Sequence, residues 1–170
     1  MGTNSLAKLL DSHAPALVLF AKQWCTVPED VVQEAFIKLF AQTTTPDNPV
    51  AWLYRVVRNR AINEARADRR RKRREQRVAS ESETWFVPPD TNGVDAEEAT
   101  RALRNLPVEQ REVIVAHVWG GLTFQEIART VRCSSSTAHR RYLAGIESLR
   151  DRLESTCQTT PTPTFREDLS

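Results

Sequence analysis

The chain has 170 residues, of which 40% are hydrophobic and 27% are charged, and only five are glycine. This composition argues against collagen-like and disordered chains, and no uninterrupted apolar run approaches the roughly 18 residues of a membrane-spanning helix. The net charge is only +2, yet residues 51–80 carry eleven basic side chains against three acidic ones and residues 101–154 carry nine against six, which indicates a nucleic-acid partner.

The first 77 residues predict three helices. Apolar residues between positions 6 and 24 follow a 3.6-residue repeat, so the first helix should end near Thr26 and Pro28. The turn-forming run Thr43 to Pro49 should separate the second helix from a third that begins near Val50. The apolar stripe expected on the second helix consists of Val32, Ala35, Phe36, Leu39 and Phe40.

The third helix is predicted to join a core face to a basic arm. Its continuation over residues 66–77 holds eight basic side chains, which is typical of a segment that binds a polyanion. The apolar side of its first part consists of Trp52, Leu53, Val56, Val57, Ala61 and Ala65.

Residues 78–95 are predicted to be a linker, because they combine proline and glycine pairs with an excess of acidic side chains. A second helical set should occupy residues 96–155, and repeated threonine-proline neighbours indicate a disordered tail over 156–170. The expected fold class is all-α, with two small helical domains (1–77 and 96–155) joined by a flexible acidic linker.

The second set has the spacing of a helix-turn-helix. After a helix that begins at Pro107, carries Val118 on its apolar side and is terminated by Gly120-Gly121, Thr123 and Glu126 match the capping box of a short helix. Ser134 can then cap a longer final helix, after a turn of three to four residues. Arg132 stands where many such turns carry glycine; a positive φ there would cost about 1 kcal/mol, so a remodelled turn is expected.

Polar side chains near the start of the final helix could reach base edges in the major groove, while Arg141 and Arg150 could lie over phosphates. The alternative is a plain solvated face on a helical hairpin. The candidate reading residues are Ser135, Ser136, His139 and Arg140.

The cysteines and histidines do not predict a catalytic or metal site. Cys25, Cys133 and Cys157 are odd in number and lack close pairs, which favours a reducing cytoplasm, and the start of the chain is not a secretory signal. The three histidines have no partner at a recognisable spacing, and a glycine-rich phosphate loop is absent from the sequence. We therefore expect no catalysis, metal, cofactor or small-molecule substrate.

The order of these motifs resembles the extracytoplasmic-function group of sigma factors, which are subunits of bacterial RNA polymerase. Residues 29–36 resemble the segment that binds the coiled coil of the polymerase's largest subunit. Residues 51–63 are similar to the helix for the −10 promoter element, and residues 106–141 to the domain for the −35 element. The resemblance implies promoter recognition, DNA melting and transcription initiation, with core RNA polymerase (coiled coil and flap), promoter DNA and an anti-sigma factor as partners.

The resemblance also implies roles for individual residues. The alternatives are an ordinary solvated face for the second helix, polar surface side chains without a partner for the asparagine pair, and a plain connecting loop for the threonines. The loop from Thr43 to Pro49 would hold a base that leaves the stack. The polymerase-binding residues would be Asp30, Val32, Gln33, Glu34 and Lys38. The −10 element would meet Trp52, Arg55, Arg58, Asn59, Asn63 and Arg66. The −35 element would meet Ser135, Ser136, Thr137, His139, Arg140 and Arg141.

The alternative function is a stand-alone DNA-binding regulator, because the helix-turn-helix also resembles that of the LuxR group. Such a regulator needs a receiver or a ligand pocket before the helix-turn-helix. Residues 1–75 show no alternation of strands and helices and no aspartate-rich phosphoryl site, which favours the sigma factor.

Overall fold

The computed structural model describes residues 3–75 and 101–157. Most of these residues are helical and none lies in a strand, which confirms the all-α fold class. The linker predicted at 78–95 and most of the tail predicted at 156–170 lie outside them. The helices are α1 (Thr3–Ala21), α2 (Pro28–Phe40), α3 (Pro49–Glu75), α5 (Val108–Val118), α6 (Phe124–Val131) and α7 (Ser135–Cys157).

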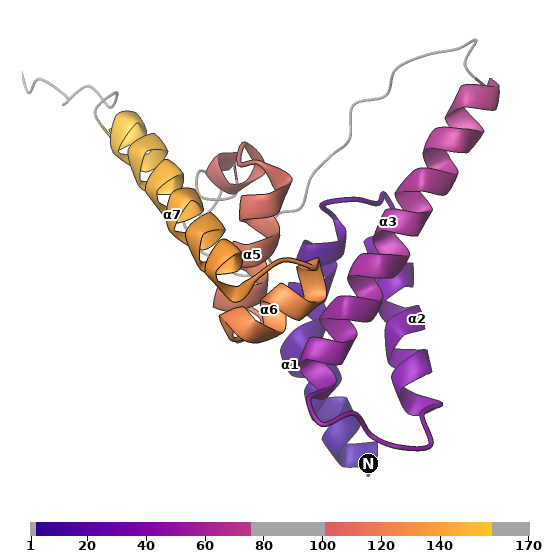
Figure 1. Ribbon diagram of the computed structural model, residues 1–170. Helices are drawn as coiled ribbons and strands as arrows, with labels where there is room; N and C mark the ends of the chain where they lie inside the picture. Colours follow the sequence, from indigo (N-terminus) through magenta and orange to yellow (C-terminus); the bar gives the residue numbers. More distant parts are fainter. Residues whose placement is uncertain (1–2, 76–100, 158–170) are drawn as a thin grey trace, which may run out of the picture.

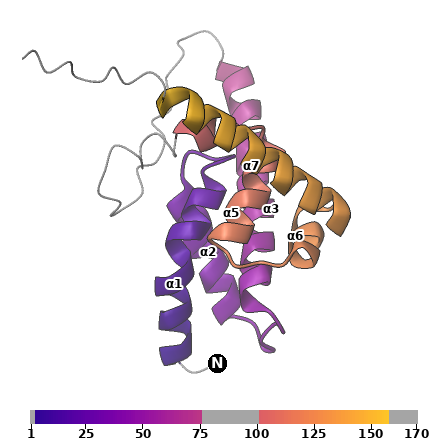
Figure 2. The same ribbon diagram turned by 90° about the vertical axis from the view of Figure 1, so that its left-hand side faces the viewer.

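The helices form two sets that lie side by side. Figure 1 shows α1, α2 and α3 packed together, with the end of α3 extending beyond its two neighbours. Helices α5, α6 and α7 gather against this bundle, and Figure 2 shows α7 crossing the outer side of α5. The basic part of α3 therefore projects from the bundle, while the first part belongs to the core.

Three predicted features differ from the structure at helix ends. Helix α1 ends at Ala21 and not near Thr26, and the chain continues in turns closed by bonds such as Trp24 N–H to the Ala21 carbonyl, at 3.0 Å. Phe40 and Val118, predicted in apolar stripes, are 62% and 52% exposed. Each is the last residue of its helix, and periodicity buries a side chain only where another element covers it.

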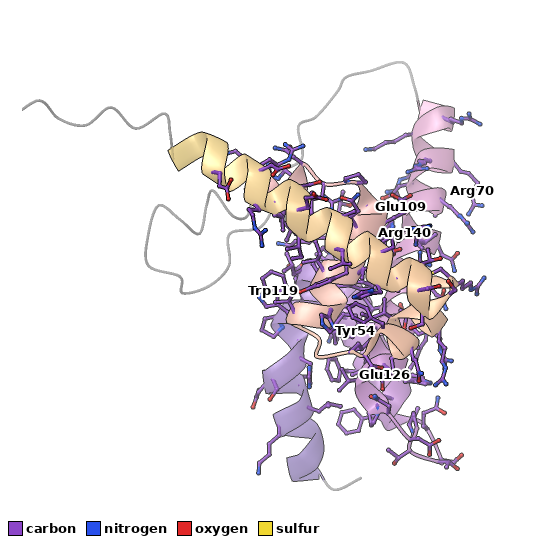
Figure 3. All side chains as sticks on the ribbon, turned by 60° about the vertical axis from the view of Figure 1, so that its left-hand side comes forward. Tyr54, Arg70, Glu109, Trp119, Glu126 and Arg140 are labelled. Carbon is purple, nitrogen blue, oxygen red and sulfur yellow. The ribbon has the colours of Figure 1, made fainter. Side chains whose placement is uncertain are left out.

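One apolar core joins the two sets. Tyr54 of α3 is fully buried between them, with its ring centroid 4.8 Å from that of Phe20 in α1 (Figure 3). Gly120, just after α5, lies directly on this ring: a Cβ there would come within 2.7 Å of the Tyr54 Cζ atom and would also meet the Ala116 carbonyl oxygen. Glycine is therefore required where the second set meets the first.

Within residues 3–75 and 101–157, no helix has both the length and the apolarity that crossing a bilayer requires.

Substitution Gly120→Ala should lower the free energy of unfolding by about 1–3 kcal/mol, because the added methyl overpacks the contact with Tyr54. Gly121→Ala is the matched control: it meets open space and only has to tolerate a φ of +65°, at a cost of about 1 kcal/mol. Urea denaturation of both variants checks this. A Gly120→Ala variant as stable as Gly121→Ala would contradict the close packing at Tyr54.

Candidate nucleic-acid interface

Helix α3 presents a polar face opposite its core face. Its start is capped by Asn48, whose Oδ1 accepts the Ala51 N–H at 3.0 Å. The buried side carries Leu53, Val57 and Ala61, each with no exposed area. The exposed side carries Arg55, Asn59, Asn63 and Arg66. The predicted asparagine pair and two of the predicted arginines thus reach solvent together.

The end of α3 forms an open basic cleft. A cavity of about 730 Å³ is lined only by basic side chains, and Arg70 points away from the bundle (Figure 3). Such a concentration of positive charge on one helix attracts a polyanion over distances of a Debye length, about 10 Å at ordinary salt. The lining residues are Arg66, Arg69, Arg70, Lys72 and Arg73.

Two of the predicted −10 residues are not presented to solvent. Trp52 is half-buried and packs against the core. The Arg58 side chain is 17% exposed; its Nε donates to Oε2 of Glu112 in α5 at 2.8 Å, and its guanidinium lies 5.6 Å from the centre of the Trp24 ring. Glu112 itself is 2% exposed. A residue predicted to hold DNA is therefore paired with a carboxylate from the other helical set.

Glu112 lies in a largely apolar environment with a cation on one side. Its neighbours along α5, Val113, Ile114 and Val115, are buried and apolar. Burial raises the pKa of Glu112, while the hydrogen bond and positive charge of Arg58 act in the opposite direction. Without Arg58, this carboxylate would lose its hydrogen bond and its main positive neighbour, and the charge of Arg141 would be the smaller compensation left.

Side-chain hydrogen bonds cap the starts of both helices of the helix-turn-helix. Thr123 Oγ1 accepts the Glu126 N–H, and Glu126 Oε2 accepts the Thr123 N–H at 2.8 Å, so the predicted capping box is confirmed. Ser134 caps α7 as predicted, accepting the Thr137 N–H at 3.0 Å. The predicted remodelling of the turn is wrong: Arg132 adopts the left-handed conformation with φ of 60°, so the turn carries a strained residue where glycine would fit without strain.

The first turns of α7 carry the predicted reading residues on an outer face. Ala138 is fully buried where α7 meets the rest of the motif. Thr137 and Arg141 are half-buried, and the Thr137 hydroxyl lies 2.8 Å from that of Ser134. The exposed residues of this face are Ser135, Ser136, His139 and Arg140.

The outer face of α2 is more apolar than predicted. Val32, predicted to contact a partner, is 4% exposed and belongs to the core. Ile37 and Phe40 are instead exposed, at 59% and 62%. With Gln33 they form an i, i+4, i+7 series, a signal that the sequence already contained.

Charged residues surround these apolar side chains on α2. Asp30, Gln33 and Lys38 are exposed, as predicted for a polar face. Glu34 is half-buried and bridges Lys38 at 2.9 Å and Arg60 at 2.6 Å; hydrogen bonds from these two cations lower the pKa of Glu34.

The structure also brings α3 next to the turn of the helix-turn-helix. Asn59, Asn63 and Arg66 share a cavity of about 350 Å³ with Arg132. Sequence analysis assigned neither Arg132 nor Glu112 to the site, because contacts between distant segments leave no local pattern. Across the described ranges, no group of three or more His, Cys, Asp and Glu side chains is placed to hold a metal ion.

Comparison with known proteins identifies both helical sets. The model described as "Sigma-70 region 2" matches residues 9–71, and "Sigma-70, region 4" matches residues 96–149. The ECF RNA polymerase sigma-E factor of Haemophilus influenzae is 27% identical over 139 residues, which cover 74% of each chain. The ECF RNA polymerase sigma factor SigK of Mycobacterium tuberculosis is 25% identical over 138 residues, 74% of this chain and 72% of the relative.

Two solved structures have a similar fold. The sigma factor RpoE of Bartonella quintana, in complex with the anti-sigma factor NepR, matches with a TM-score of 0.71 and 25% identity, over 89% of this chain and 98% of that one. CnrH, in complex with the cytosolic domain of CnrY, matches with a TM-score of 0.57 and 23% identity over 91% and 90%.

Substitution Arg132→Gly should raise the free energy of unfolding by roughly 0.5–1 kcal/mol, because glycine adopts the left-handed conformation without the penalty of a Cβ. Arg129→Gly, an exposed position inside α6, is the control and should lower it by about 1 kcal/mol. Thermal unfolding of both variants measures the two effects. Equal destabilisation by the two glycines would show that the turn is not strained.

The capping box also predicts a pH dependence. The Thr123 N–H lowers the pKa of Glu126, and hydrogen bonds from the Thr123 hydroxyl and from Asn48 add to this. A carboxyl whose folded pKa lies below its unfolded value, about 4.3, stabilises the fold above that pH and loses this contribution as the pH falls. Between pH 5 and pH 3, the wild type should therefore lose more stability than Glu126→Gln in urea titrations. Parallel losses would contradict this role of Glu126.

Proposed function

The chain belongs to the extracytoplasmic-function group of the sigma-70 family, which directs promoter recognition and transcription initiation with core RNA polymerase, and we propose how its own residues divide that work. The order of a region 2 match, a basic helix and a capped helix-turn-helix in a region 4 match carries the proposal. In this proposal the polymerase, and not this chain, performs the nucleotidyl transfer. Residues 1–77 and 96–155 are proposed to act as two domains, each with its own promoter element.

Helix α2 is proposed to bind the coiled coil of the polymerase's largest subunit. Exposed Ile37 and Phe40 offer apolar area, and Asp30, Gln33 and Lys38 around them offer charge and hydrogen bonds that set the register of a reversible contact. In this arrangement Val32 supports the helix from the core side. The second domain would contact the polymerase flap.

Helix α3 is proposed to read the −10 element. Asn59 and Asn63, which share one exposed face, would contact base edges, while Arg55, Arg66 and the basic cleft would hold phosphates. The largely exposed loop from Thr43 to Pro49, between α2 and α3, would receive a base extruded from the stack as the DNA opens. Trp52 and Arg58 are assigned to this element too, and Arg58 must then leave Glu112.

Helix α7 is proposed to read the −35 element in the major groove. Ser136, His139 and Arg140 are exposed on its first turns, where recognition helices reach base edges. Ser135 lies beside them, and Thr137 and Arg141 would complete the contact at its margin. Arg150, ten residues after Arg140 in the same helix, is exposed and is proposed to contact phosphate.

An anti-sigma factor is proposed as a further partner, and the cytoplasm as the location. Both solved relatives were captured in complexes, RpoE with the anti-sigma factor NepR and CnrH with the cytosolic domain of CnrY, which supports the first proposal. The second follows from the location of bacterial RNA polymerase.

The decisive experiment adds the full chain to sigma-free core polymerase and genomic DNA of its source, and sequences the run-off transcripts. We expect transcripts from a small set of start sites that share two upstream elements. Binding of duplex DNA by the chain alone, with no effect on polymerase, would instead support a stand-alone regulator.

On a promoter found in this way, two variants distinguish base recognition from phosphate binding. Asn63→Ala should reduce discrimination against a changed −10 base by about 1–3 kcal/mol, because the amide contacts a base edge. Arg70→Ala should weaken binding to all promoters alike and lower the salt slope by about 1. Lys8→Ala, which removes one exposed charge from α1, is the control and should change neither quantity. Filter binding by core polymerase carrying each variant, across a salt series with matched and mismatched promoters, measures both.

A further inference from the structure

Three aromatic rings, each from a different helix, form a series of contacts that ends at the start of α7. His117 lies near the end of α5, Phe124 is the first residue of α6, and His139 lies on the first turns of α7. The centroids of the His117 and Phe124 rings are 4.5 Å apart, and the rings are stacked at 23°. Phe124 then meets the His139 ring edge to face, at 4.9 Å and 71°. A residue proposed to read DNA therefore contacts a ring from outside its own helix.

The His117 end of this series is fixed to the backbone. Its Nδ1 lies 2.8 Å from the carbonyl oxygen of Leu122, and because a carbonyl only accepts, Nδ1 carries the proton and donates it. The His117 ring also meets the Tyr142 ring edge to face, with 5.0 Å between the centroids. His117 thus offers Phe124 a stacking surface of fixed orientation.

Phe124 is itself held from two directions. It directly follows Thr123, the N-cap of the capping box, so the cap fixes the backbone from which the ring projects. On α7 the ring contacts both His139 and Tyr142, which are three positions apart and therefore lie on the same side of the helix. Phe124 is half-buried whereas His139 is exposed, so this contact leaves part of the imidazole open to a partner.

A ring contact of this kind orders an exposed side chain before anything binds to it. Ordering a mobile side chain at an interface costs free energy, and a side chain that already occupies its bound rotamer avoids most of that cost. Aromatic pairs at such separations are favourable beyond the area that they bury. The contact with Phe124 therefore favours one orientation of the His139 imidazole in the free chain.

We propose that Phe124 is a positioning residue for His139, whose imidazole it fixes in the orientation that selects one base of the −35 element. This inference deepens the proposed function and rests on it, because it takes α7 as the recognition helix. An imidazole N–H donates a hydrogen bond. In the major groove guanine offers the acceptors N7 and O6, whereas cytosine offers a donor. His139 therefore favours guanine at the base that it contacts and disfavours cytosine.

A purely structural role for Phe124 makes a different prediction. If the ring only stabilised the helix-turn-helix, its loss would weaken binding to every −35 sequence to the same extent, with or without His139. A positioning role predicts a loss at a single base, and no further loss once the imidazole has been removed, because the two side chains then act as one unit.

The first measurement finds the base that His139 reads. Core polymerase carrying the full chain is bound to a promoter in which each base pair of the −35 element is changed in turn. His139→Ala should reduce discrimination between guanine and cytosine at one position by roughly tenfold, as the loss of a base-edge contact does. If no position responds in a chain that still directs transcription, the inference is wrong and the proposed function stands.

Phe124→Leu is the decisive variant. At the position found with His139→Ala, it should reduce discrimination by about threefold to tenfold, and it should add nothing when both substitutions are combined. Phe124→Tyr keeps the ring and should restore discrimination to the wild-type value. Trp119→Leu, which removes a half-exposed ring from the same helical set, is the matched control and should change discrimination at no position. An equal loss at all −35 bases, or a further loss in the double variant, would overturn the proposal.

A second readout needs neither DNA nor polymerase, so it also decides the matter if Phe124→Leu is poorly folded. The chain has three histidines, and the NMR signals of His139 are those that His139→Ala lacks. Three-bond couplings at its Cβ should show one χ1 rotamer in the wild type and in Phe124→Tyr, and an average over several in Phe124→Leu. Averaged couplings in the wild type would overturn the inference and leave the proposed function untouched. A polymerase that ignores the chain would overturn the proposed function and, with it, the reading role of His139.

Discussion

The structure depends on a single constraint: α3 has to be a core helix and a binding helix at the same time. Leu53, Val57 and Ala61 fix its inner side in the bundle with no exposed area, and this leaves the opposite side for partners. Between these two sides, Tyr54 and Arg58 contact the second helical set, through Gly120 and Glu112. Helix α3 therefore joins the two sets and still presents its outer side to solvent.

The boundary between the sets combines apolar area with a buried charge. Gly120 packs closely on the Tyr54 ring, and this contact is favourable and involves no charged group. The Arg58–Glu112 pair supplies an interaction that another anion can replace. A boundary of apolar side chains alone would close at least as firmly, since well-packed hydrophobic replacements for buried ion pairs are often neutral or stabilising. The charged pair is thus weak evidence that this boundary is especially stable.

Much of the fold follows from local patterns. The 3.6-residue repeat located the helices, and the chemistry of Thr123, Glu126 and Ser134 located the helix-turn-helix caps, because capping needs particular side chains at a fixed spacing. Periodicity was wrong at Phe40 and Val118, because each is the last residue of its helix and no other element covers it. Periodicity placed Val32 correctly on the apolar stripe, whereas the family resemblance assigned it to a partner-binding face although this residue lies in the core.

The contact between the two sets could not be read from local patterns. Arg58 and Glu112 are 54 positions apart, and the sequence around each residue does not indicate that the two side chains meet. Arg58 is one of many arginines, and Glu112 has the sequence context of an ordinary exposed charge on a helix. Val113, Ile114 and Val115 are all buried, and because successive residues of a helix point in different directions, their burial indicates that α5 is covered on more than one side. A helix covered on several sides needs more than its own domain to cover it, and α1 of the first set supplies part of that cover. A carboxylate on such a helix needs compensating positive charge, which Arg58 of the first set supplies by a hydrogen bond and Arg141 of the second set adds to by its charge.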